Sequence, residues 1–292
     1  KPDLFYSPDG WLSLRTPVKS LPVIHDLNFF HYPDFIPYTV RKYYQNFFPR
    51  FIKRACRIAT VSEYTAHDIQ RLFHVPENRI DIVYNGASGF LPKEPDVKRQ
   101  VMETYTGGHP YFISIGLIHP RKNLTNLFKA YDIFRRNVQS DVRLVVAGAK
   151  KWWTKDMQDA YDQCLYHDDI LFTGRIPDDE LKNLLASALG LVYVSWFEGF
   201  GLPVLEAMQS DVPAICSSVS SLPEVGGNAV LYARPEDPDS ISSAMVQLYK
   251  DPKLREQLIS KSRIRREMFT WEKTAGLLWE SMEKSLKERQ KK

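Results

Sequence analysis

Two carboxylates frame a glycine-rich turn in the stretch EGFGLPVLE. Glu198 precedes Gly199 and Gly201, and Glu206 lies eight residues after Glu198. The glycines allow a tight turn and Pro203 is typical of a first helical turn, so we expect a helix that starts near Gly201. Its first N–H groups would attract phosphate. Because an ionised carboxylate only accepts hydrogen bonds, two such groups beside a phosphate site suit the hydroxyls of a nucleotide sugar.

Two adjacent cations supply the opposite charge. Arg121 and Lys122 stand in ISIGLIHPRKNL, after an expected strand that ends at Gly116 and before a helix with Asn123 as its cap. Parallel sheets bind ligands at the carboxyl ends of their strands. Arginine can hold two phosphate oxygens with its forked guanidinium, and lysine adds a point charge. The pair therefore predicts a diphosphate site.

Short apolar runs alternate with helical patterns along most of the chain, which predicts an α/β fold of parallel sheets with helices on both faces. The chain opens on a strand, in KPDLFYSP, and further strands are expected at Leu21–His25, Arg57–Val61, Ile80–Tyr84, Tyr111–Gly116, Arg143–Gly148, Ile170–Gly174, Gly190–Val194, Pro213–Ser217 and Ala229–Tyr232. Apolar residues spaced by three and four predict helices that include Asn123–Asn137, Asp178–Ser187 and Gly201–Gln209.

The length of 292 residues suits two domains. A stretch rich in proline, glycine and charge, Ala87–Gln100, is the predicted linker. We predict a partial N-terminal Rossmann-like domain at 1–90, a C-terminal Rossmann-like nucleotide-sugar-binding domain at 91–270 and a C-terminal helical tail at 271–292. The first domain has few strands before the linker, so we expect it to be truncated. The charged tail is expected to end as a solvated helix.

The composition is that of an ordinary globular protein, with 43% hydrophobic and 25% charged residues. The apolar, uncharged run Leu184–Phe197 is too short to cross a bilayer. Cys56, Cys164 and Cys216 are widely spaced and form no CxxC. They predict neither a disulfide framework nor a zinc site, which favours a cytoplasmic location. The net charge of +4 is compatible with an acidic ligand.

The motifs together resemble those of a known enzyme family. They are EGFGLPVLEAM, GLIHPRKN, ATVSEYTAHDI, VYNGA, FTGRIPDDEL and SSLPEVGGNAVLY, and the matches run from about Val23 to Tyr232. In this order they resemble the retaining glycosyltransferases of the glycogen-synthase-like superfamily (glycosyl transferases group 1), closest to family 4. The resemblance implies the GT-B fold, in which two Rossmann-like domains with parallel sheets face each other across a cleft. It also makes the partial first domain the acceptor side.

The resemblance further implies roles for single residues. In the family, the residue at the Glu198 position faces the transferred sugar and the one at the Glu206 position holds the ribose. Arg121 and Lys122 match the cations that neutralise the leaving diphosphate, and His25 in PVIHDLNF matches a histidine of the reaction centre. The other implied donor-binding positions are Gly116, Gly199, Phe200, Gly201 and Leu202 in the loops, and Arg175 and Ile176 in the base pocket.

The implied reaction transfers a hexose from a nucleotide-diphosphate sugar to a glycan or lipid-linked glycan acceptor, with retention, for surface polysaccharide biosynthesis. Two cations and a helix dipole would replace a divalent metal, so no metal and no other cofactor is expected. The stretch VIHDLNFFHYPDFIP resembles mannosyltransferases and favours GDP-mannose over a UDP-hexose donor. Two alternatives stay open: a nucleotide-sugar epimerase of the same fold, and a non-catalytic nucleotide-sugar-binding fragment.

Other sequence patterns do not indicate a metal site, a dehydrogenase or a nucleic-acid-binding protein. Asp237-Pro238-Asp239 resembles a DxD metal motif, but we expect Asp239 or Ser240 to cap the helix Ile241–Tyr249 instead. GFGLP lacks the third glycine of a dinucleotide fingerprint, which argues against a dehydrogenase. No motif for binding nucleic acid is present.

The stretch RKYYQNFFPRFIKRACR can be interpreted in two ways. At helical spacing its cations share one face, among aromatic residues, and Pro49 is expected to start or kink the helix. These cations are Arg50, Lys53, Arg54 and Arg57. A basic aromatic helix can rest on an anionic bilayer, which would place the protein peripherally at the inner face of the membrane. The alternative is a solvated basic face over a phenylalanine core.

Overall fold

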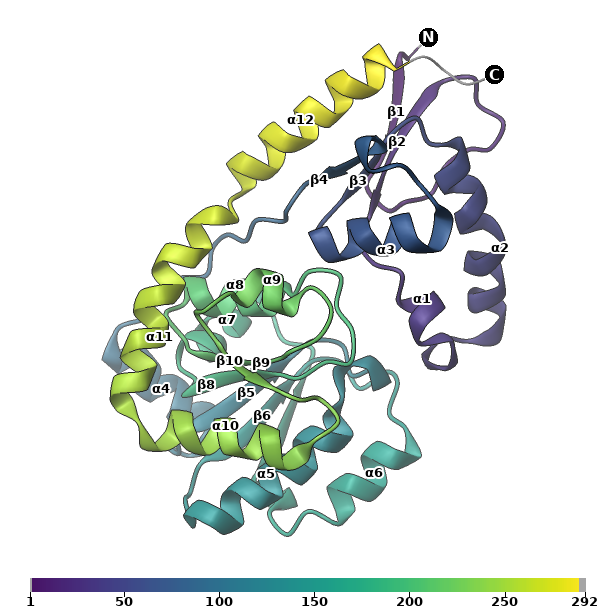
Figure 1. The fold of residues 1–292 in the computed structure, drawn as a ribbon. Helices are drawn as coiled ribbons and strands as arrows, with labels where there is room; N and C mark the ends of the chain where they lie inside the picture. Colours follow the sequence, from purple (N-terminus) through teal and green to yellow (C-terminus); the bar gives the residue numbers. More distant parts are fainter. Residues whose placement is uncertain (1, 289–292) are drawn as a thin grey trace. The chain divides into compact units, whose positions relative to one another are not determined.

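The computed structural model describes residues 2–288. The chain forms two compact units. The first combines residues up to 86 with 198–200 and the chain from 269 onward, and the second contains 87–197 and 201–268. Both units hold a parallel sheet with helices on both faces (Figure 1), which confirms the predicted α/β class.

The first unit contains a four-stranded sheet in the order β1-β2-β3-β4, with every neighbouring pair parallel. Figure 1 shows this sheet between α12 on one side and α2 on the other. The strands are β1 (Leu4–Ser7), β2 (Lys19–Ile24), β3 (Ile58–Thr60) and β4 (Ile80–Ile82), and the helices are α1 (Asn28–His31), α2 (Tyr38–Arg54), α3 (Glu63–Phe73) and α12 (Trp271–Lys287).

Helix α2 buries Phe48 and Phe51, and its basic face is smaller than predicted. Phe48 and Phe51 lie in the core of the first unit, at 4% and 5% exposure. Pro49 sits inside the helix rather than at its start. Arg57 lies beyond the helix end, buried, with its Nε 2.7 Å from Asp81 Oδ2. Because the helix ends at Arg54, Arg57 cannot share a face with the other cations.

The predicted C-terminal helical tail, whose end was expected to be solvated, contains helix α12, which packs against β1, β2 and β4 of the first unit. Ser281 and Ser285 are fully buried in this contact. Ser281 donates a hydrogen bond of 2.7 Å to Asp81. Small side chains at these positions let the helix approach the sheet closely. The last part of the predicted tail, residues 289–292, lies outside the described residues.

The second unit contains a six-stranded parallel sheet in the order β10-β9-β8-β5-β6-β7. Its first strand, β5, is central: the chain extends the sheet first through β6 and β7, and then on the other side through β8, β9 and β10. The strands are β5 (Tyr111–Ile115), β6 (Arg143–Ala147), β7 (Ile170–Gly174), β8 (Gly190–Tyr193), β9 (Ala214–Ser217) and β10 (Leu231–Ala233).

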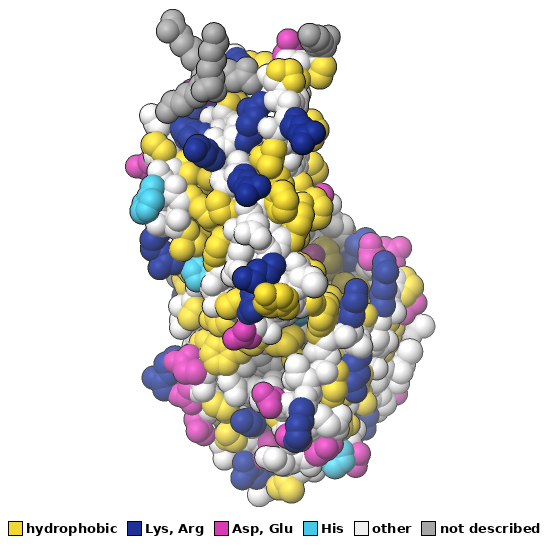
Figure 2. Space-filling view, turned by 90° about the vertical axis from the view of Figure 1, so that its right-hand side faces the viewer, with side chains coloured by type: hydrophobic (Ala, Val, Ile, Leu, Met, Phe, Trp, Pro, Cys, Tyr) yellow, Lys and Arg dark blue, Asp and Glu magenta, His cyan; other side chains and the backbone are white. Residues whose placement is uncertain are grey.

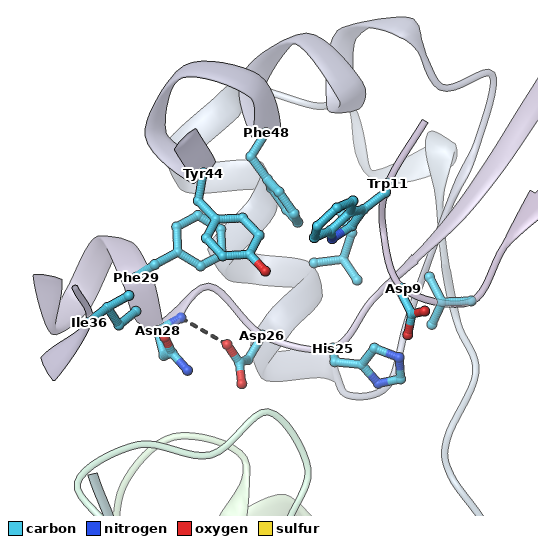
Figure 3. Close-up of a pocket in the computed structure, with 11 residues that line it drawn as sticks. Asp9, Trp11, His25, Asp26, Asn28, Phe29, Ile36, Tyr44 and Phe48 are labelled. Atoms are coloured by element: carbon cyan, nitrogen blue, oxygen red, sulfur yellow. Dashed lines mark hydrogen bonds between the residues drawn. The ribbon is translucent and has the colours of Figure 1, made fainter. Parts of the chain in front are cut away.

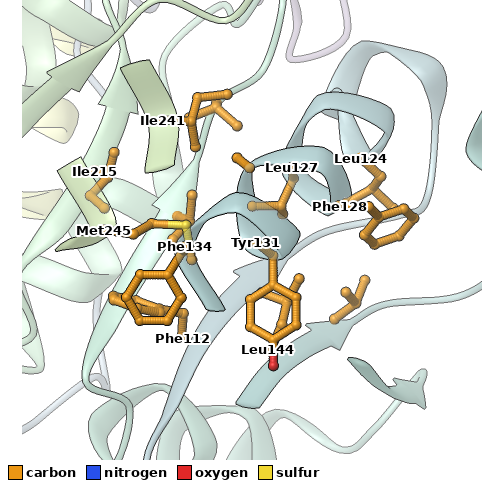
Figure 4. Packing of buried hydrophobic residues seen from close by; sticks show 14 of the residues in the cluster. Phe112, Leu124, Leu127, Phe128, Tyr131, Phe134, Leu144, Ile215, Ile241 and Met245 are labelled. Carbon is orange, nitrogen blue, oxygen red and sulfur yellow. The ribbon is translucent and has the colours of Figure 1, made fainter. Parts of the chain in front are cut away.

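Helices cover both faces of this sheet. Figure 1 shows α5, α6 and α10 on one side and α7, α8 and α9 on the other. Helix α5 buries apolar residues that recur at spacings of three and four against Phe112 of β5 and Met245 of α10 (Figure 4). The helices are α4 (Pro95–Thr106), α5 (Leu124–Val138), α6 (Lys155–Asp162), α7 (Asp178–Ala186), α8 (Leu202–Gln209), α9 (Leu222–Gly226), α10 (Pro238–Lys250) and α11 (Pro252–Arg265).

Each strand expected from the apolar runs occurs, with ends that differ from the prediction by one or two residues at most. The predicted helices also occur, as α5, α7, α8 and α10. The predicted linker Ala87–Gln100 begins without regular structure, but its last part already belongs to α4, which starts at Pro95. Pro95, one of the prolines that suggested a linker, is thus the first residue of a helix, where its missing N–H costs nothing.

Candidate active site

The strand order of the second unit identifies one edge of its sheet as a binding site. Chain direction across the sheet reverses between β5 and β8, which are neighbours. Such a switch point, at the carboxyl ends of the strands, is where open α/β sheets bind ligands. The loop after β5 carries Gly116, Arg121 and Lys122, and the chain after β8 leads to Gly201 and α8. The structure therefore brings these predicted residues to the same edge.

Arg121 connects the loop after β5 with the loop after β8 through hydrogen bonds. Its guanidinium Nη1 donates to the Phe197 carbonyl at 2.8 Å, and its own carbonyl accepts from the Trp196 N–H at 2.9 Å. Both contacts span more than 70 residues of sequence. The side chain is half-buried, so the loop after β8 determines where this cation points.

Lys122 is held by the end of β8. Its Nζ donates to the Tyr193 hydroxyl at 2.5 Å and lies 4.5 Å from the centre of that ring. The lysine stem crosses Gly116, where an added Cβ would lie 3.2 Å from Lys122 Cε. Gly116 also has φ +133°, which disfavours any residue with a Cβ. Gly116 is therefore needed both for the turn and for the path of the lysine.

Asn123 does not cap α5 as predicted. It has a left-handed backbone, with φ 59°, and its side chain makes no capping hydrogen bond. Its amide instead donates to the carbonyls of Val194 at 3.0 Å and Pro235 at 2.7 Å. Asparagine tolerates this conformation better than most residues, and its two N–H donors suit two carbonyls. Asn123 thus fastens the cation loop to the loop after β8.

Helix α8 begins at the switch point as the turn predicted. Gly201 precedes it with φ +107°, and an added Cβ there would lie 2.5 Å from Leu222 Cδ2. Pro203 occupies the first turn. Within residues 2–288 the N–H groups of Gly201 and Leu202 donate to no backbone carbonyl. These N–H groups are therefore available as hydrogen-bond donors at the start of the helix, where an anion is favoured.

Glu206 is a half-buried residue on α8. Its pKa is raised to about 7, mainly by burial and also by the charge of Asp178, while the charge of Lys122 acts in the opposite direction. Its carboxylate forms no hydrogen bond with any residue of the described part of the chain. A partly buried acceptor without a donor is unfavourable, and a ligand with hydroxyl groups would supply donors.

Arg175 and Ile176 follow β7, two strands away from β5. Arg175 is exposed and Ile176 half-buried. Because all strands are parallel, both residues lie at the same edge of the sheet as Arg121 and Lys122. Within this unit they lie further from the switch point than Gly116, which directly follows β5.

The first unit holds the remaining predicted residues. His25 follows β2, is exposed, and has its Nε2 2.8 Å from the Pro8 carbonyl oxygen. Glu198 and Phe200 are 6% and 4% exposed. An added Cβ on Gly199 would lie 1.9 Å from the His25 carbonyl oxygen, so only glycine fits there. Within this unit the structure therefore brings His25 next to the segment Glu198–Phe200.

Three features of the site were not predicted from the sequence: Tyr193, Asn123 as a loop anchor, and Gly148. An added Cβ on Gly148, which has φ +156°, would lie 1.9 Å from the Gly116 carbonyl oxygen. A glycine at the end of a predicted strand was the only available signal for Gly148. A tyrosine at a strand end gave none for Tyr193, because its partner is 71 residues away in sequence.

The rejected metal motif is a helix cap. Asp237, rather than the predicted Asp239 or Ser240, caps α10 by accepting hydrogen bonds from the N–H groups of Asp239 and Ser240 at 3.0 and 3.2 Å. Among residues 2–288, no group of three or more His, Cys, Asp or Glu side chains could hold a metal ion. None of the helices in that range has the length and apolar character to span a bilayer.

Known proteins match both units. The family model described as "Glycosyl transferases group 1" matches residues 100–265, and the model "Glycosyltransferase Family 4" matches residues 1–88. O-antigen chain mannosyltransferase B of Escherichia coli is 32% identical over 271 residues, which cover 92% of this chain and 71% of that protein. O-antigen chain mannosyltransferase RfbU of Salmonella typhimurium is 27% identical, with 86% and 72% covered.

Solved structures share the fold. Sucrose-phosphate synthase from Thermosynechococcus elongatus has a TM-score of 0.78 at 20% identity, covering 97% of this chain and 74% of that one. Anabaena Alr3699/HepE, in complex with UDP and glucose, has a TM-score of 0.79 at 15% identity, covering 97% and 78%. These similarities confirm the predicted GT-B fold. With a family model over more than half of its length and a relative at 32% identity, the chain belongs to the group 1 glycosyl transferases.

Proposed function

We propose that this chain transfers a hexose, mannose from GDP-mannose, to a glycan or lipid-linked glycan acceptor, with retention of anomeric configuration and without a metal ion. The observation that carries the proposal is the edge of the second sheet, where Arg121 and Lys122 lie at the β5–β8 switch point with α8. Two relatives named as O-antigen chain mannosyltransferases support a mannose donor and a glycan acceptor. Alr3699/HepE, solved with UDP-glucose, supports a nucleotide sugar.

The reaction breaks the bond between the anomeric carbon and the diphosphate oxygen, and the bonding electron pair stays on that oxygen. Arg121, Lys122 and the N–H groups at the start of α8 stabilise the negative charge that develops there. Such stabilisation by groups that are already in place is usually the largest catalytic contribution. An acceptor hydroxyl then attacks the sugar from the face that the diphosphate leaves, and its proton passes to the departing diphosphate oxygen.

The glutamates and His25 bind the sugars in this account. Glu206 accepts hydrogen bonds from the ribose hydroxyls, which supply the donors that its carboxylate lacks. Glu198 faces the transferred hexose, His25 belongs to the reaction centre, and Arg175 and Ile176 contact the base. Because Arg121 and Lys122 already place two positive charges at the diphosphate, the chemistry needs no divalent cation.

The test is a transfer assay with GDP-mannose or a UDP-hexose and a mannose-containing glycan, with and without excess EDTA. We expect transfer from GDP-mannose, an unchanged rate in EDTA, and a product whose new linkage keeps the α-configuration of the donor by NMR. Release of an epimerised nucleotide sugar without acceptor would identify an epimerase. Nucleotide binding without turnover would identify a non-catalytic fragment, and loss of activity in EDTA would contradict the metal-free mechanism.

We also propose peripheral contact of helix α2 with an anionic membrane. Figure 2 shows Lys and Arg side chains among hydrophobic ones on the face of the first unit that carries α2. Lys42, Arg50 and Lys53 are exposed there, and so is Tyr43 at 37%. Arg54 contributes little to this surface, because its guanidinium donates to the Thr16 and Val18 carbonyls.

Vesicle flotation tests the membrane proposal. The protein should bind vesicles with phosphatidylglycerol and not those of phosphatidylcholine alone, and added salt should weaken binding. Lys53→Glu should weaken binding, while Lys129→Glu, on an exposed position of α5, should not. Equal binding to both kinds of vesicle, or no binding, would exclude this surface.

A further inference from the structure

The first unit contains a cavity that none of the donor-site assignments uses. Its volume is about 270 Å³, roughly nine times the ~30 Å³ that a water molecule occupies in the liquid. The residues that line it include Asp9 and Trp11 in the loop after β1, Asp26 in the loop after β2, Asn28 at the start of α1, and Tyr44 of helix α2. We propose that this cavity binds one neutral hexopyranose unit of the glycan acceptor, an inference that rests on the proposed function.

Aromatic rings form one wall of the cavity. Tyr44 stacks on the buried Phe29, with ring centres 4.8 Å apart and planes at 22°. Trp11 stands nearly perpendicular to Tyr44, at 6.2 Å and 80°, and is 49% exposed. Figure 3 shows the Trp11 and Tyr44 side chains facing the same space. An indole that is half exposed beside a cavity offers an apolar surface, which suits the C–H face of a pyranose ring.

Acceptor groups form the opposite wall. One oxygen of Asp26 accepts the Asn28 N–H at 3.0 Å, and Asp9 makes no hydrogen bond or ion pair with any residue of the described chain. Figure 3 shows Asp26 and the Tyr44 hydroxyl on the open space between the rings. An ionised carboxylate only accepts hydrogen bonds, and its bonds to hydroxyl donors are stronger than neutral ones. The wall therefore selects a ligand rich in hydroxyl donors.

The charge of the lining excludes the donor's phosphates from this cavity. Two carboxylates line it, and neither lysine nor arginine does. A nucleoside diphosphate or another anion would be repelled there, whereas Arg121 and Lys122 of the second unit suit it. A neutral sugar with an apolar face and hydroxyl edges fits both walls.

The cavity lies beside the predicted reaction-centre residues of the same unit. His25 lines it, and Asp26 Cβ would lie 2.8 Å from a Cβ added to Gly199. A sugar in the cavity is thus next to the chain segment that carries Glu198 and His25. An acceptor must present its hydroxyl near such residues, which separates this cavity from a remote carbohydrate-anchoring site.

Binding can be measured without catalysis. Saturation-transfer NMR of the full chain, with GDP present, would use methyl α-mannoside, methyl β-galactoside and methyl N-acetylglucosaminide as probes. We expect at least one glycoside to bind, with a weakening of about tenfold or more in Trp11→Ala and in Asp26→Asn. Trp279→Ala is the matched control, since Trp279 is 65% exposed on α12 of the same unit. Binding of none of the glycosides, or equal binding by all variants, would overturn the proposal.

A transfer assay separates this inference from the proposed function. In an active enzyme, Asp26→Asn and Trp11→Ala should raise the acceptor KM about tenfold and leave the donor KM and donor hydrolysis unchanged. If the wild-type protein transfers sugar from none of the donors, the proposed function is contradicted. The glycoside titration would still show whether the cavity binds a sugar. Normal transfer with an unchanged acceptor KM in both variants would overturn the acceptor site. Melting curves confirm that the variants fold.

Discussion

The Lys122 ammonium group donates a 2.5 Å hydrogen bond to the Tyr193 hydroxyl and lies 4.5 Å from the centre of the same ring. Tyr193 is the last residue of β8 and is 3% exposed. A rigid strand end therefore positions a flexible side chain. A lysine in water would have to lose rotamer freedom to meet a diphosphate, and here much of that loss has occurred before the ligand binds.

Tyr193→Phe should lower kcat about tenfold and change the donor KM little. The phenyl ring keeps the cation–π contact, but the hydrogen bond that orients the ammonium is lost. Lys122→Ala should cost more, about 10²- to 10³-fold in kcat, as for other groups that stabilise charge in the transition state. Steady-state kinetics with varied donor measures both. A rise in KM alone would show that Lys122 serves ground-state binding.

Glu206→Gln should weaken GDP binding by about 1–3 kcal/mol, the usual loss when a charge-assisted hydrogen bond is removed. Calorimetry measures the change, and Glu224→Gln, on α9 of the same unit, is the control. Unchanged affinity would remove Glu206 from the ribose role.

The affinity of the wild-type protein for GDP should fall as the pH drops below about 7. The pKa of Glu206 is raised to about 7 by burial, so the carboxylate that accepts ribose hydroxyls becomes protonated in this range. Glu206→Gln should bind GDP with a constant, lower affinity between pH 5.5 and 8.5, a range chosen to span roughly that pKa. Parallel pH profiles for the two proteins would contradict this role.

The same carboxyl group should make the free protein less stable at higher pH. Its folded-state pKa is above its ordinary value of 4.5, so the folded state binds the proton more tightly. The stability that this proton contributes is complete below about 4.5 and is lost as the pH rises through about 7. Relative to wild type, Glu206→Gln should therefore gain up to about 3 kcal/mol between these limits. Melting temperatures at pH 5 and 8 measure it, and an equal difference at both would contradict the assignment.

Gly148→Ala should destabilise the protein by more than about 2 kcal/mol and weaken GDP binding. Its Cβ would meet the Gly116 carbonyl oxygen at 1.9 Å and displace the loop that carries Lys122. Gly107→Ala is the control: φ is +63°, but no atom lies within 4 Å of the added Cβ. It should cost only about 1 kcal/mol, from backbone strain, and leave GDP binding intact.

Arg57→Ala should destabilise the first unit by about 3–5 kcal/mol, because it leaves the buried Asp81 without its main partner. The pair is 9% and 10% exposed, and its two hydrogen bonds measure 2.7 and 2.8 Å. Burial acts to raise the pKa of Asp81, but the hydrogen bonds from Arg57 and Ser281 outweigh it and lower the pKa. Arg50→Ala, on an exposed position, should change the melting temperature little. Equal changes in melting temperature for Arg57→Ala and Arg50→Ala would show that the Arg57–Asp81 pair does not stabilise this unit.

The strands and main helices could be predicted because their apolar residues repeat with the period of each element. The order of the strands could not, since pairing depends on contacts far apart in sequence. The switch point between β5 and β8 emerges only from that order. The position of Arg121 and Lys122 at this switch point is what makes these two adjacent cations a candidate phosphate site.

The residues that hold the loops of the site in place could not be predicted from the sequence, for the same reason. Asn123 had the sequence signal of a helix cap, yet its amide binds two carbonyls in other loops. The charged segment after residue 270 had the composition of a solvated helix. Two buried serines and Asp81 anchor it to the first unit instead.

Calorimetric titration with GDP and UDP tests the central claim, that the switch point of the second unit binds a nucleoside diphosphate through Lys122. We expect one of the two nucleotides to bind selectively, with a Kd in the micromolar range. Lys122→Ala should weaken that binding at least tenfold, and the corresponding nucleoside without phosphates should bind weakly to both proteins. Lys122 is preferred to Arg121, whose guanidinium also holds the Phe197 carbonyl. No binding of either nucleotide, or equal affinity in Lys122→Ala, would contradict the account.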